Sequence, residues 1–319
     1  MDKKIDTLVR VSELYYQQNL SQNTISEIMG VSRPTVSRLL EEARSVGVVE
    51  IVIHSPVRKN PELSQELRTK LGLRDVIVVA GEYDHDAALK KCAEATINFL
   101  GSIIENNITI GISWGRALQN FCELLPNGDY YNINIVQMAG CLGNGNPSVD
   151  GLELAIRISK KLNGTYANIY APVFVDSELV YSYLMKENQI QNTLKKSNKT
   201  DIILTGIGVA DDKEGSIYRA GYFSEKEIQE IIDRGAVGHL LARWIDINGN
   251  ELFYPGRYTI SAPLEALRNA EWSIGICASA SKAKATLAAV NGKYVNTLVI
   301  DESLAKELLN LIKLGLLKK

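Results

Sequence analysis

The chain of 319 residues has few of the residues that build metal centres and disulfide frameworks. It contains three histidines and four cysteines, and the cysteines stand far apart, without a CxxC pair or a neighbouring histidine: Cys92, Cys122, Cys141 and Cys277. Zinc sites need closely spaced ligands, and small disulfide scaffolds need a high density of cysteine. The sequence therefore predicts reduced cysteines, no bound metal and no resident cofactor.

Long apolar runs are also missing. No segment approaches the roughly 18–20 consecutive apolar residues of a membrane-spanning helix. The amino terminus, Met1-Asp2-Lys3-Lys4, does not open a secretory signal peptide. Hydrophobic residues make up 45% of the chain and charged residues 23%, values typical of a soluble globular protein. We expect a cytoplasmic protein without a membrane partner, long enough for more than one domain.

An excess of positive charge is absent as well. The formal net charge is −2, and residues 1–60 hold eight Lys and Arg against seven Asp and Glu. A nucleic-acid-binding face must therefore come from the placement of a few basic residues: Arg33, Arg38, Arg44, Arg58 and Lys59. Because affinity for DNA grows with the number of phosphates that a protein neutralises, a single copy is expected to bind weakly. We therefore expect a homo-oligomer.

Residues 22–40 carry the most specific pattern in the chain. Ile25, Ile28 and Met29 lie at helical spacing and predict one buried face, and Gly30 ends that helix. Ser32 then provides an N-cap for a second helix, in which Val36, Leu39 and Leu40 predict another buried face. The side chains left to face outward are hydroxyls and guanidinium groups: Ser32, Arg33, Thr35, Ser37 and Arg38.

Short hydroxyl side chains and a helix amino terminus bind phosphates, and Arg reads guanine edges in the major groove. We therefore predict a helix-turn-helix whose second helix contacts double-stranded DNA through these five residues, in preference to a helical hairpin with a solvated polar face. Residues 5–18 predict a supporting helix, and residues 48–53 a strand of a small β-wing. This DNA-binding domain spans residues 1–54, His54 being a solvated loop residue, and residues 55–61 form a linker with two prolines.

Residues 62–319 have a different pattern, in which apolar strands alternate with amphipathic helices. The predicted strands are residues 76–80, 108–113, 133–139, 167–175, 202–207, 273–278 and 294–300, with a further segment at 239–247. Near-continuous apolar strands between helices predict a largely parallel sheet covered on both faces. The fold class is therefore an amino-terminal helix-turn-helix, winged if the strand at 48–53 forms, followed by an α/β effector and oligomerisation domain.

Ligands of open α/β sheets bind beyond the carboxyl ends of the strands, where helix amino termini present free amides. Four such strand ends contain glycine or small polar residues: 109–118, 137–140, 205–208 and 279–282. Each alone could be turn chemistry, but their convergence on one edge favours a binding cleft. The segment Gly111-Ile-Ser113-Trp-Gly115 also matches the GxSxG pattern of hydrolases, with Asp201 or Asp211 and His239 following in order. The lack of an oxyanion motif such as HGGG argues against that chemistry.

Taken together, these residues make the chain resemble bacterial regulators of the SorC type, to which sorbitol-operon and deoxyribonucleoside regulators belong. The resemblance extends over residues 5–310. Its marks are residues 14–16, 32–40, 111–116, 221–223, 235–238, 246–249 and 292–296. It implies a sugar-sensing transcription factor that binds palindromic operators as a tetramer, with a sugar or sugar-phosphate effector. The implied effector domain is similar in fold to ribose-5-phosphate isomerases and glucosamine-phosphate deaminases without their catalysis, so the chain is expected not to be an enzyme. The alternative is an α/β enzyme, isomerase-like or a GxSxG hydrolase, joined to a DNA-binding head.

The resemblance also assigns site residues. The phosphate-loop positions of the family fall on Gly111, Ser113, Trp114, Gly115 and Arg116, with Lys282 completing the anion pocket. The positions that contact sugar hydroxyls fall near Gln137, Gly140, Gly206 and Asp246.

Three departures from the family pattern bear on the ligand. His239 replaces an aspartate of many members, which puts hydroxyl selectivity in question and leaves open whether the imidazole faces the ligand. Ala139 replaces a lysine of some deoxyribose-sensing members, so a Schiff base at that position is excluded. Ser279-Ala280 replaces the usual Gly-Gly, which favours an unphosphorylated sugar or polyol, or a differently seated phosphate.

Overall fold

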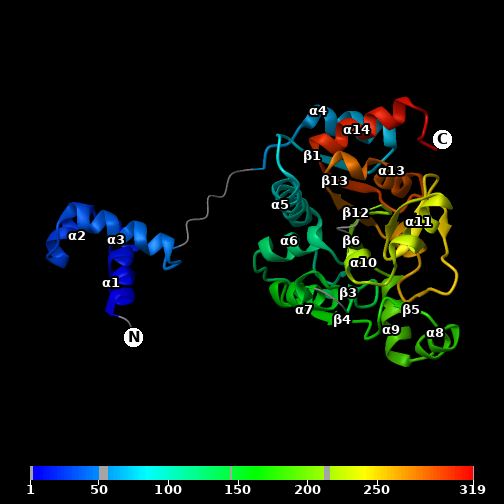
Figure 1. Ribbon diagram of the computed structural model, residues 1–319, viewed down its shortest axis with the longest axis horizontal. Coiled ribbons are helices and arrows are strands. Elements are labelled where there is room, and N and C mark those ends of the chain that lie inside the picture. The colour runs from blue at the N-terminus through cyan, green and yellow to red at the C-terminus, as the bar shows by residue number, and fades with distance from the viewer. Residues whose placement is uncertain (1–2, 50–56, 144–145, 212–215, 319) are drawn as a thin grey trace. The chain divides into compact units, whose positions relative to one another are not determined.

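The computed structural model describes residues 3–49, 57–143, 146–211 and 216–318 of the chain (Figure 1). The chain forms two units, Met1–Pro56 and Val57–Lys319. Each unit packs around its own buried side chains and is described separately below.

Within residues 3–49, the first unit has three α-helices and one π-helical turn. Its elements are α1 (Lys3–Ser12), the turn η1 (Glu13–Gln17), α2 (Gln22–Met29) and α3 (Arg33–Ser45). Gly30, with φ of +64°, ends α2 in the left-handed conformation that costs glycine little. Ser32 begins α3, since its Oγ accepts a hydrogen bond from Thr35 N–H at 3.4 Å. The small core is made by Val11, Leu14, Ile25, Val36 and Leu40.

Several apolar residues of this unit are exposed, among them Ile28, which was predicted to be buried. Ile5 is 50% exposed, Val9 38% and Ile28 53%, whereas Met29 and Leu39 are half-buried. The short helices of this unit enclose only one small core, which cannot cover every apolar side chain on them. The side chains furthest from that core remain at the surface. The predicted strand over residues 48–53 does not begin where expected, because Val48 lies in a bend and Val49 N–H donates to the Ala43 carbonyl of α3 at 3.1 Å. Residues 50–53 of that prediction lie outside the described residues, as do His54 and residues 55 and 56 of the predicted linker.

The second unit is built on a sheet of seven parallel strands in the order β1-β13-β12-β6-β2-β3-β4. These strands are β1 (Asp75–Val79), β2 (Thr109–Ile112), β3 (Asn134–Gln137), β4 (Thr165–Ala167), β6 (Ile202–Gly206), β12 (Trp272–Cys277) and β13 (Thr297–Asp301). Residues 57–60 lie along β1, where Lys59 forms a bridge to Val79, and Asn60 caps the first helix of the unit.

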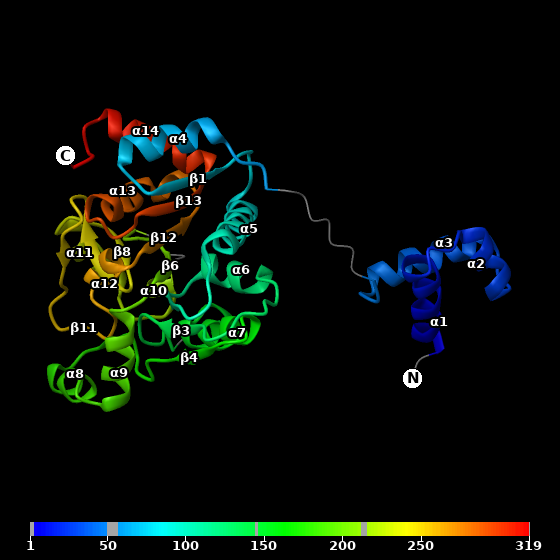
Figure 2. The same ribbon diagram turned by 180° about the vertical axis from the view of Figure 1, so that it is seen from behind.

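Helices cover both faces of this sheet (Figures 1 and 2). On one face a core forms with α4 (Pro61–Leu71), α13 (Ala283–Asn291) and α14 (Glu302–Lys313). On the other face a second core forms with α5 (His85–Ile103), α6 (Arg116–Leu124) and α7 (Gly151–Lys161). Strands buried on both faces account for their near-continuous apolar sequences, so the predicted α/β domain with a largely parallel sheet is confirmed.

Two small antiparallel sheets complete the second unit. The first has the order β10-β9-β8-β7, with β7 (Gly208–Val209), β8 (Ala236–Leu240), β9 (Arg243–Asp246) and β10 (Glu251–Leu252). The second pairs β5 (Phe174–Val175) with β11 (Tyr258–Thr259). The remaining elements are α8 (Glu178–Leu184), α9 (Asn188–Ser197), α10 (Ser216–Arg219), α11 (Glu225–Asp233), α12 (Glu265–Asn269) and the 3₁₀ turns η2 (Pro147–Val149) and η3 (Ala280–Lys282).

The predicted single strand over residues 167–175 is wrong, because the structure has two short strands there. The chain leaves the parallel sheet after Ala167, and Ile169 N–H donates to the Gln137 side chain at 2.8 Å instead of to a strand. Phe174 and Val175 then pair with β11. In the described part of the chain, no helix is both long and apolar enough to cross a membrane.

Candidate functional site

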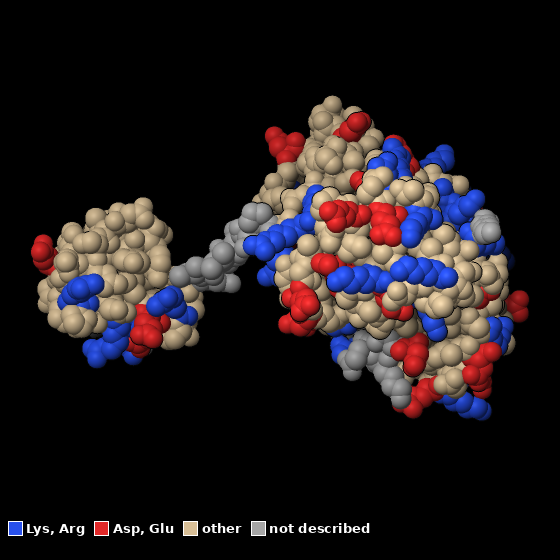
Figure 3. Space-filling model, turned by 90° about the horizontal axis from the view of Figure 1, so that it is seen from above, with Lys and Arg blue, Asp and Glu red and all other residues tan. Residues whose placement is uncertain are grey.

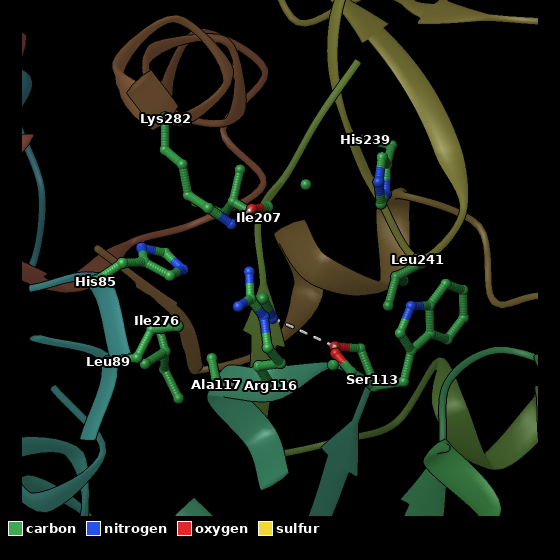
Figure 4. Close-up of a pocket in the computed structure, with 14 residues that line it drawn as sticks. His85, Leu89, Ser113, Arg116, Ala117, Ile207, His239, Leu241, Ile276 and Lys282 are labelled. Atoms are coloured by element: carbon green, nitrogen blue, oxygen red, sulfur yellow. Dashed lines mark hydrogen bonds between the residues drawn. The ribbon is translucent and has the colours of Figure 1, made fainter. Parts of the chain in front are cut away.

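A cavity lies at the carboxyl end of the parallel sheet, where the strand order reverses. From β2 the chain continues outward to β3 and β4, and it then returns on the other side of β2 with β6, β12 and β13. Such a reversal separates the loops that follow the two neighbouring strands, which opens a crevice between them. The cavity holds about 670 Å³ of empty space, part of it open to solvent (Figure 4).

Ser113 holds the ends of β2 and β6 together at the floor of this cavity. It follows β2 directly, is 4% exposed, and its Oγ accepts a hydrogen bond from Gly206 N–H at 3.3 Å (Figure 4). Trp114 is also buried and lines the same space. The hydroxyl therefore ties two strand ends together while facing the cavity.

Gly115 turns the chain from β2 into α6. Its φ of +109° and ψ of 173° lie in a region that is open essentially to glycine alone. This turn directs the amino terminus of α6 at the cavity, which Gly115, Arg116 and Ala117 all line. The first amides of a helix have no acceptor within the helix and carry a partial positive charge. The arrangement is suited to binding an anion or a hydroxyl-rich ligand.

Two cationic side chains reach the cavity from opposite sides. Lys282, just before α13, donates from Nζ to the Ile207 carbonyl at 2.8 Å, and Figure 4 shows its chain extended along the cavity wall. Arg116 is 42% exposed and forms an ion pair of 3.4 Å with Asp86, which is itself 83% exposed. His85, the first residue of α5, also lines the cavity. Cations outnumber carboxylates in this lining, which favours ligands with negative or strongly polar groups.

His239 on β8 closes another side of the cavity with a neutral imidazole. Its ring lies directly over Gly208, where a Cβ atom would stand 2.0 Å from Nε2. Burial, and then the charge of Lys282, lower the pKa of His239 from 6.5 to about 3. The edge of its ring also contacts Trp244, with ring centroids 5.2 Å apart. The imidazole faces the ligand space, and being uncharged it can donate from one nitrogen and accept at the other.

Six of the ten predicted effector contacts line this cavity: Ser113, Trp114, Gly115, Arg116, Gly206 and Lys282. The lining also contains residues that were not predicted as contacts: Ala117, Ile207 and Gly208 lie inside two of the predicted strand-end segments, whereas His85, Leu89, Leu241 and Ile276 lie outside them. His85 begins α5, the helix that follows the apolar strand β1, but without a motif this position is a weak signal.

Gln137 and Gly140 do not line the cavity and have structural roles. Gln137 is fully buried, its Oε1 accepts from Ile169 N–H at 2.8 Å, and its Nε2 lies 3.9 Å from the Cys141 sulfur. A Cβ at Gly140 would stand 2.7 Å from the Ala171 carbonyl oxygen, so glycine is needed for backbone packing. The structure therefore gives neither residue a contact with a ligand in this cavity.

Gly111 and Asp246 are also placed elsewhere. Gly111 lies inside β2, where a Cβ would stand 2.6 Å from the Met138 sulfur, so its role is strand packing. Asp246 closes the turn between β9 and β10, since its carboxylate accepts from the N–H groups of Asn248 at 2.9 Å and Asn250 at 2.8 Å. That carboxylate is used within its own turn.

The predicted DNA contacts lie at the start of α3 in the first unit. Ser32, Arg33, Ser37 and Arg38 are exposed, and Thr35 is half-buried. Ser32 and Thr35 bond to each other, with 2.9 Å between their hydroxyl oxygens. The opposite side of α3 is held in the core by Val36, Leu40 and Ala43. The helix therefore presents two guanidinium groups and short hydroxyl side chains to solvent.

The hydrolase-like residues do not assemble into a triad. Asp201 accepts from Thr109 N–H at 2.7 Å, which places it at the amino end of β2, whereas Ser113 follows the carboxyl end. A strand rises about 3.3 Å per residue, so the four residues of β2 separate the two groups by roughly 13 Å. Asp211 lines a different depression, beside α11. Hydrogen-bond contact within a Ser-His-Asp set is therefore missing.

The other two departures from the family pattern also have structural consequences. Ser279 has φ of +92°, a conformation that favours glycine, and its N–H donates to Asp301 Oδ1 at 2.8 Å. Ala139 is buried and bridges to Ser261 through the backbone, so its position is occupied by chain packing.

Comparison with known proteins places this geometry among regulators. Residues 55–310 match the family model Sugar-bind, described as "Putative sugar-binding domain". The chain is 30% identical to the uncharacterized transcriptional regulator YjhU of Escherichia coli, with 95% of this chain and 94% of the relative covered. It is 29% identical to the sorbitol operon regulator of Klebsiella pneumoniae, with 96% and 98% covered. The crystal structure of that full-length regulator matches with a TM-score of 0.73 at 28% identity, over 97% of this chain and 100% of the other.

Proposed function

Because the chain belongs to the Sugar-bind family of transcriptional regulators, we propose that it is a DNA-binding regulator controlled by a carbohydrate effector. The effector is a sugar, polyol or sugar phosphate that binds in the cavity between the ends of β2 and β6. The observation that carries this proposal is the cavity itself, where α6 amides, Ser113, Lys282 and the neutral imidazole of His239 converge. Donors and cations suit the phosphate or hydroxyl groups of such a ligand, and the imidazole can serve a further hydroxyl.

The first unit supplies the DNA-binding part of this proposal. Helices α2 and α3 with the turn at Gly30 form the helix-turn-helix, and α3 enters the major groove. Arg33 and Arg38 contact bases or phosphates, while Ser32, Thr35 and Ser37 add hydrogen bonds to the backbone. On the face of the second unit shown in Figure 3, Lys and Arg side chains alternate with Asp and Glu, which argues against a DNA-binding surface there.

The proposal includes an assembly of several copies. The first unit is close to neutral, so one copy neutralises few phosphates, whereas linked copies on a palindromic operator gain affinity together. We propose a tetramer. The effector then favours one arrangement of the subunits, because a ligand shifts an equilibrium only through different affinities for its two states.

The second unit is proposed to share the fold of ribose-5-phosphate isomerases and glucosamine-phosphate deaminases without their chemistry. The separation of Asp201 from Ser113, and the use of Ser113 Oγ as an acceptor for Gly206 N–H, argue against the hydrolase alternative. We expect the full chain to turn over neither sugar phosphates nor esters. Measurable turnover that disappears in Ser113→Ala would overturn this part of the proposal.

The DNA-binding part is tested by operator affinity. Arg38→Ala should weaken specific binding about 5- to 150-fold, because one good Arg contact to a base contributes roughly 1–3 kcal/mol. Arg10→Ala is the matched control, since it removes the same charge from α1 in the same unit. Fluorescence anisotropy with labelled operator measures both. Equal losses in the two variants would show that only net charge matters and would refute the assigned contact.

The effector part is tested by a thermal-shift screen over sugars, polyols and their phosphates, because a ligand of the folded state raises the melting temperature with concentration. Lys282→Met should lower the affinity for the ligand found in this way about 10- to 100-fold, because one charge-assisted hydrogen bond is lost. Lys284→Met, two residues further and exposed, should leave the affinity unchanged. A full screen without any shift would contradict the proposed effector site.

A further inference from the structure

A second cavity lies in the same unit and is separate from the first. It holds about 540 Å³ of empty space, part of it open to solvent, in the region of β5, α8 and α11 in Figure 1. Strands β9, β10 and β11 and the segment before α11 supply most of its walls. No lining residue is shared with the first cavity. Trp244 belongs to this second lining, while its neighbour His239 belongs to the first.

The walls of this second cavity are aromatic and mutually braced. Phe223 makes edge contacts with Phe174, Trp244 and Tyr254, with ring centroids 5.2, 5.6 and 5.5 Å apart. Tyr181 stacks on Tyr258 at 5.6 Å. Rings held by several partners cannot rotate freely into the empty space, so the cavity is preformed.

Two hydrogen-bond donors in this lining have no acceptor among the described residues. They are Trp244 Nε1 and Arg257 Nε, and both atoms are buried. Trp244 as a whole is 3% exposed. Buried donors without acceptors are uncommon and unfavourable in folded proteins, so each such group calls for an explanation. A ligand with an acceptor oxygen would supply the missing partner after a small shift of the side chain, because neither donor atom is accessible to solvent as the side chains stand.

The charges around the cavity decide what kind of acceptor fits. The terminal nitrogens of Arg257 already pair with Asp176 and Glu227, and Arg243 Nη1 pairs with Glu251 at 2.7 Å. Two guanidinium groups therefore face three carboxylates. This balance leaves no positive charge to attract a carboxylate or phosphate, and it favours an uncharged acceptor such as a carbonyl or amide oxygen.

We propose that this aromatic cavity is a second ligand site, which binds a small neutral molecule with a flat apolar body and a carbonyl or amide oxygen. The rings enclose the apolar body, and Trp244 Nε1 donates to the oxygen. This chemistry differs from that of the polar, cationic cavity beside β2. The site therefore goes beyond the proposed carbohydrate effector and does not depend on it.

The test uses the three tryptophans of the full chain, because each has different surroundings. Trp114 lines the first cavity, Trp244 lines the second, and Trp272 packs against Phe99 and Arg74. In protein labelled with ¹⁵N at the indoles, each gives one N–H resonance, assigned with Trp→Phe variants. The added molecules are benzamide, benzoate and toluene. Each has one aromatic ring; benzamide adds a neutral acceptor, benzoate a charged acceptor, and toluene no acceptor.

Benzamide should move the Trp244 resonance downfield and to saturation, while that of Trp272 stays in place. Benzoate and toluene should bind more weakly. Trp244→Phe keeps an aromatic ring but loses the donor, so calorimetry should show benzamide binding about fivefold more weakly, the loss of one ordinary hydrogen bond. Trp272→Phe is the control and should bind as the unaltered chain does.

Three results would overturn the proposal. One is the absence of a saturable Trp244 shift up to the solubility limit of benzamide. Another is an equal response to toluene, which would show an apolar hole without a role for the donors. The third is a Trp244 resonance that shifts on dilution together with a fall in particle mass, because a second copy of the chain would then occupy the cavity, entered beside the exposed Phe253.

Discussion

Replacing Gly208 by alanine tests the placement of His239 over the effector cavity. A Cβ atom at residue 208 would stand 2.0 Å from Nε2 of His239 and 2.2 Å from Cε1. Ordinary contacts of such an atom begin near 3.4 Å, so the imidazole would have to move by at least 1.4 Å, the difference between the two distances. The φ angle of Gly208 is not positive, so an alanine can adopt this backbone conformation. The substitution therefore adds a steric clash but little backbone strain.

The expected cost follows from the kind of clash. Forcing an extra methyl group into a packed site typically costs about 1–3 kcal/mol. His239→Ala removes the ring that the methyl group meets, so the double variant should recover most of this loss. The coupling free energy between the two positions should therefore be about 1–3 kcal/mol. Gly208→Ala alone should also lower the affinity for the effector, because the displaced imidazole enters the ligand space.

Urea unfolding followed by tryptophan fluorescence is a suitable assay. Trp114, Trp244 and Trp272 all belong to the second unit, so the signal reports on that unit alone. The four proteins of the cycle are the unaltered chain, Gly208→Ala, His239→Ala and the double variant. If Gly208→Ala costs the same free energy of unfolding with and without the imidazole, the ring does not lie over Gly208, and its position in the cavity is refuted.

Three further predictions concern charge, salt and the loop at α6. His239 has a pKa of about 3 in the folded chain and 6.5 in the unfolded chain. Between these two pH values the unfolded chain binds a proton that the folded chain does not. The free energy of unfolding therefore rises with pH in this window. His239→Gln should flatten this rise by at most about 1.4 kcal/mol per pH unit in urea unfolding, and an unchanged slope would contradict the neutral imidazole. Arg33→Ala should lower the slope of log affinity against log salt by about one if Arg33 contacts a phosphate, whereas an unchanged slope with weaker binding would indicate a base contact. Gly115→Ala forces a side chain into a glycine-only conformation at a cost of about 1–3 kcal/mol and should abolish effector binding. Gly72→Ala is the control, because it is also strained, at φ of +63°, but lies at the end of α4 and not in the effector cavity. It should lower stability and leave the effector affinity, measured by calorimetry, unchanged.

The sequence was informative where function depends on strand ends. Ser113, Gly206 and Lys282 follow three different strands, and parallel strands bring their carboxyl ends to the same edge. Glycine and small polar residues at those ends could therefore be combined into one site before any contact was known. The same rule covers His85, which begins α5 after β1, but a histidine without a motif gave too weak a signal to be selected.

The four predicted contacts that do not line the cavity show why a strand end alone is insufficient. Gln137 ends β3 at the same edge as Ser113, yet its amide binds Ile169 N–H, because the chain after β4 leaves the sheet and needs an acceptor there. Asp246 lies in a hairpin of the antiparallel sheet, where its carboxylate closes a turn. Both outcomes depend on the course of segments that carry no regular hydrophobic period, and such courses are set by tertiary packing.

Exposure in the first unit was misjudged for a related reason. Ile28 lies one turn from Ile25 on α2, and periodicity assigns both to the same face, yet only Ile25 is buried. The number of apolar residues that a helix can bury depends on the size of the core it faces, which the spacing along one helix does not reveal.

The effector cavity and the aromatic cavity both follow from one feature of the topology. The chain leaves the parallel sheet after Gly206, forms the antiparallel sheet from β7 to β10, and returns only at β12. This excursion lays His239 of β8 over the carboxyl edge of the parallel sheet and Trp244 of β9 against the aromatic cluster. The two rings contact each other on adjacent strands, with Trp244 directly opposite His239 in the register. A substitution that shifts this hairpin by one residue would exchange the faces of both rings, so it should alter both sites together.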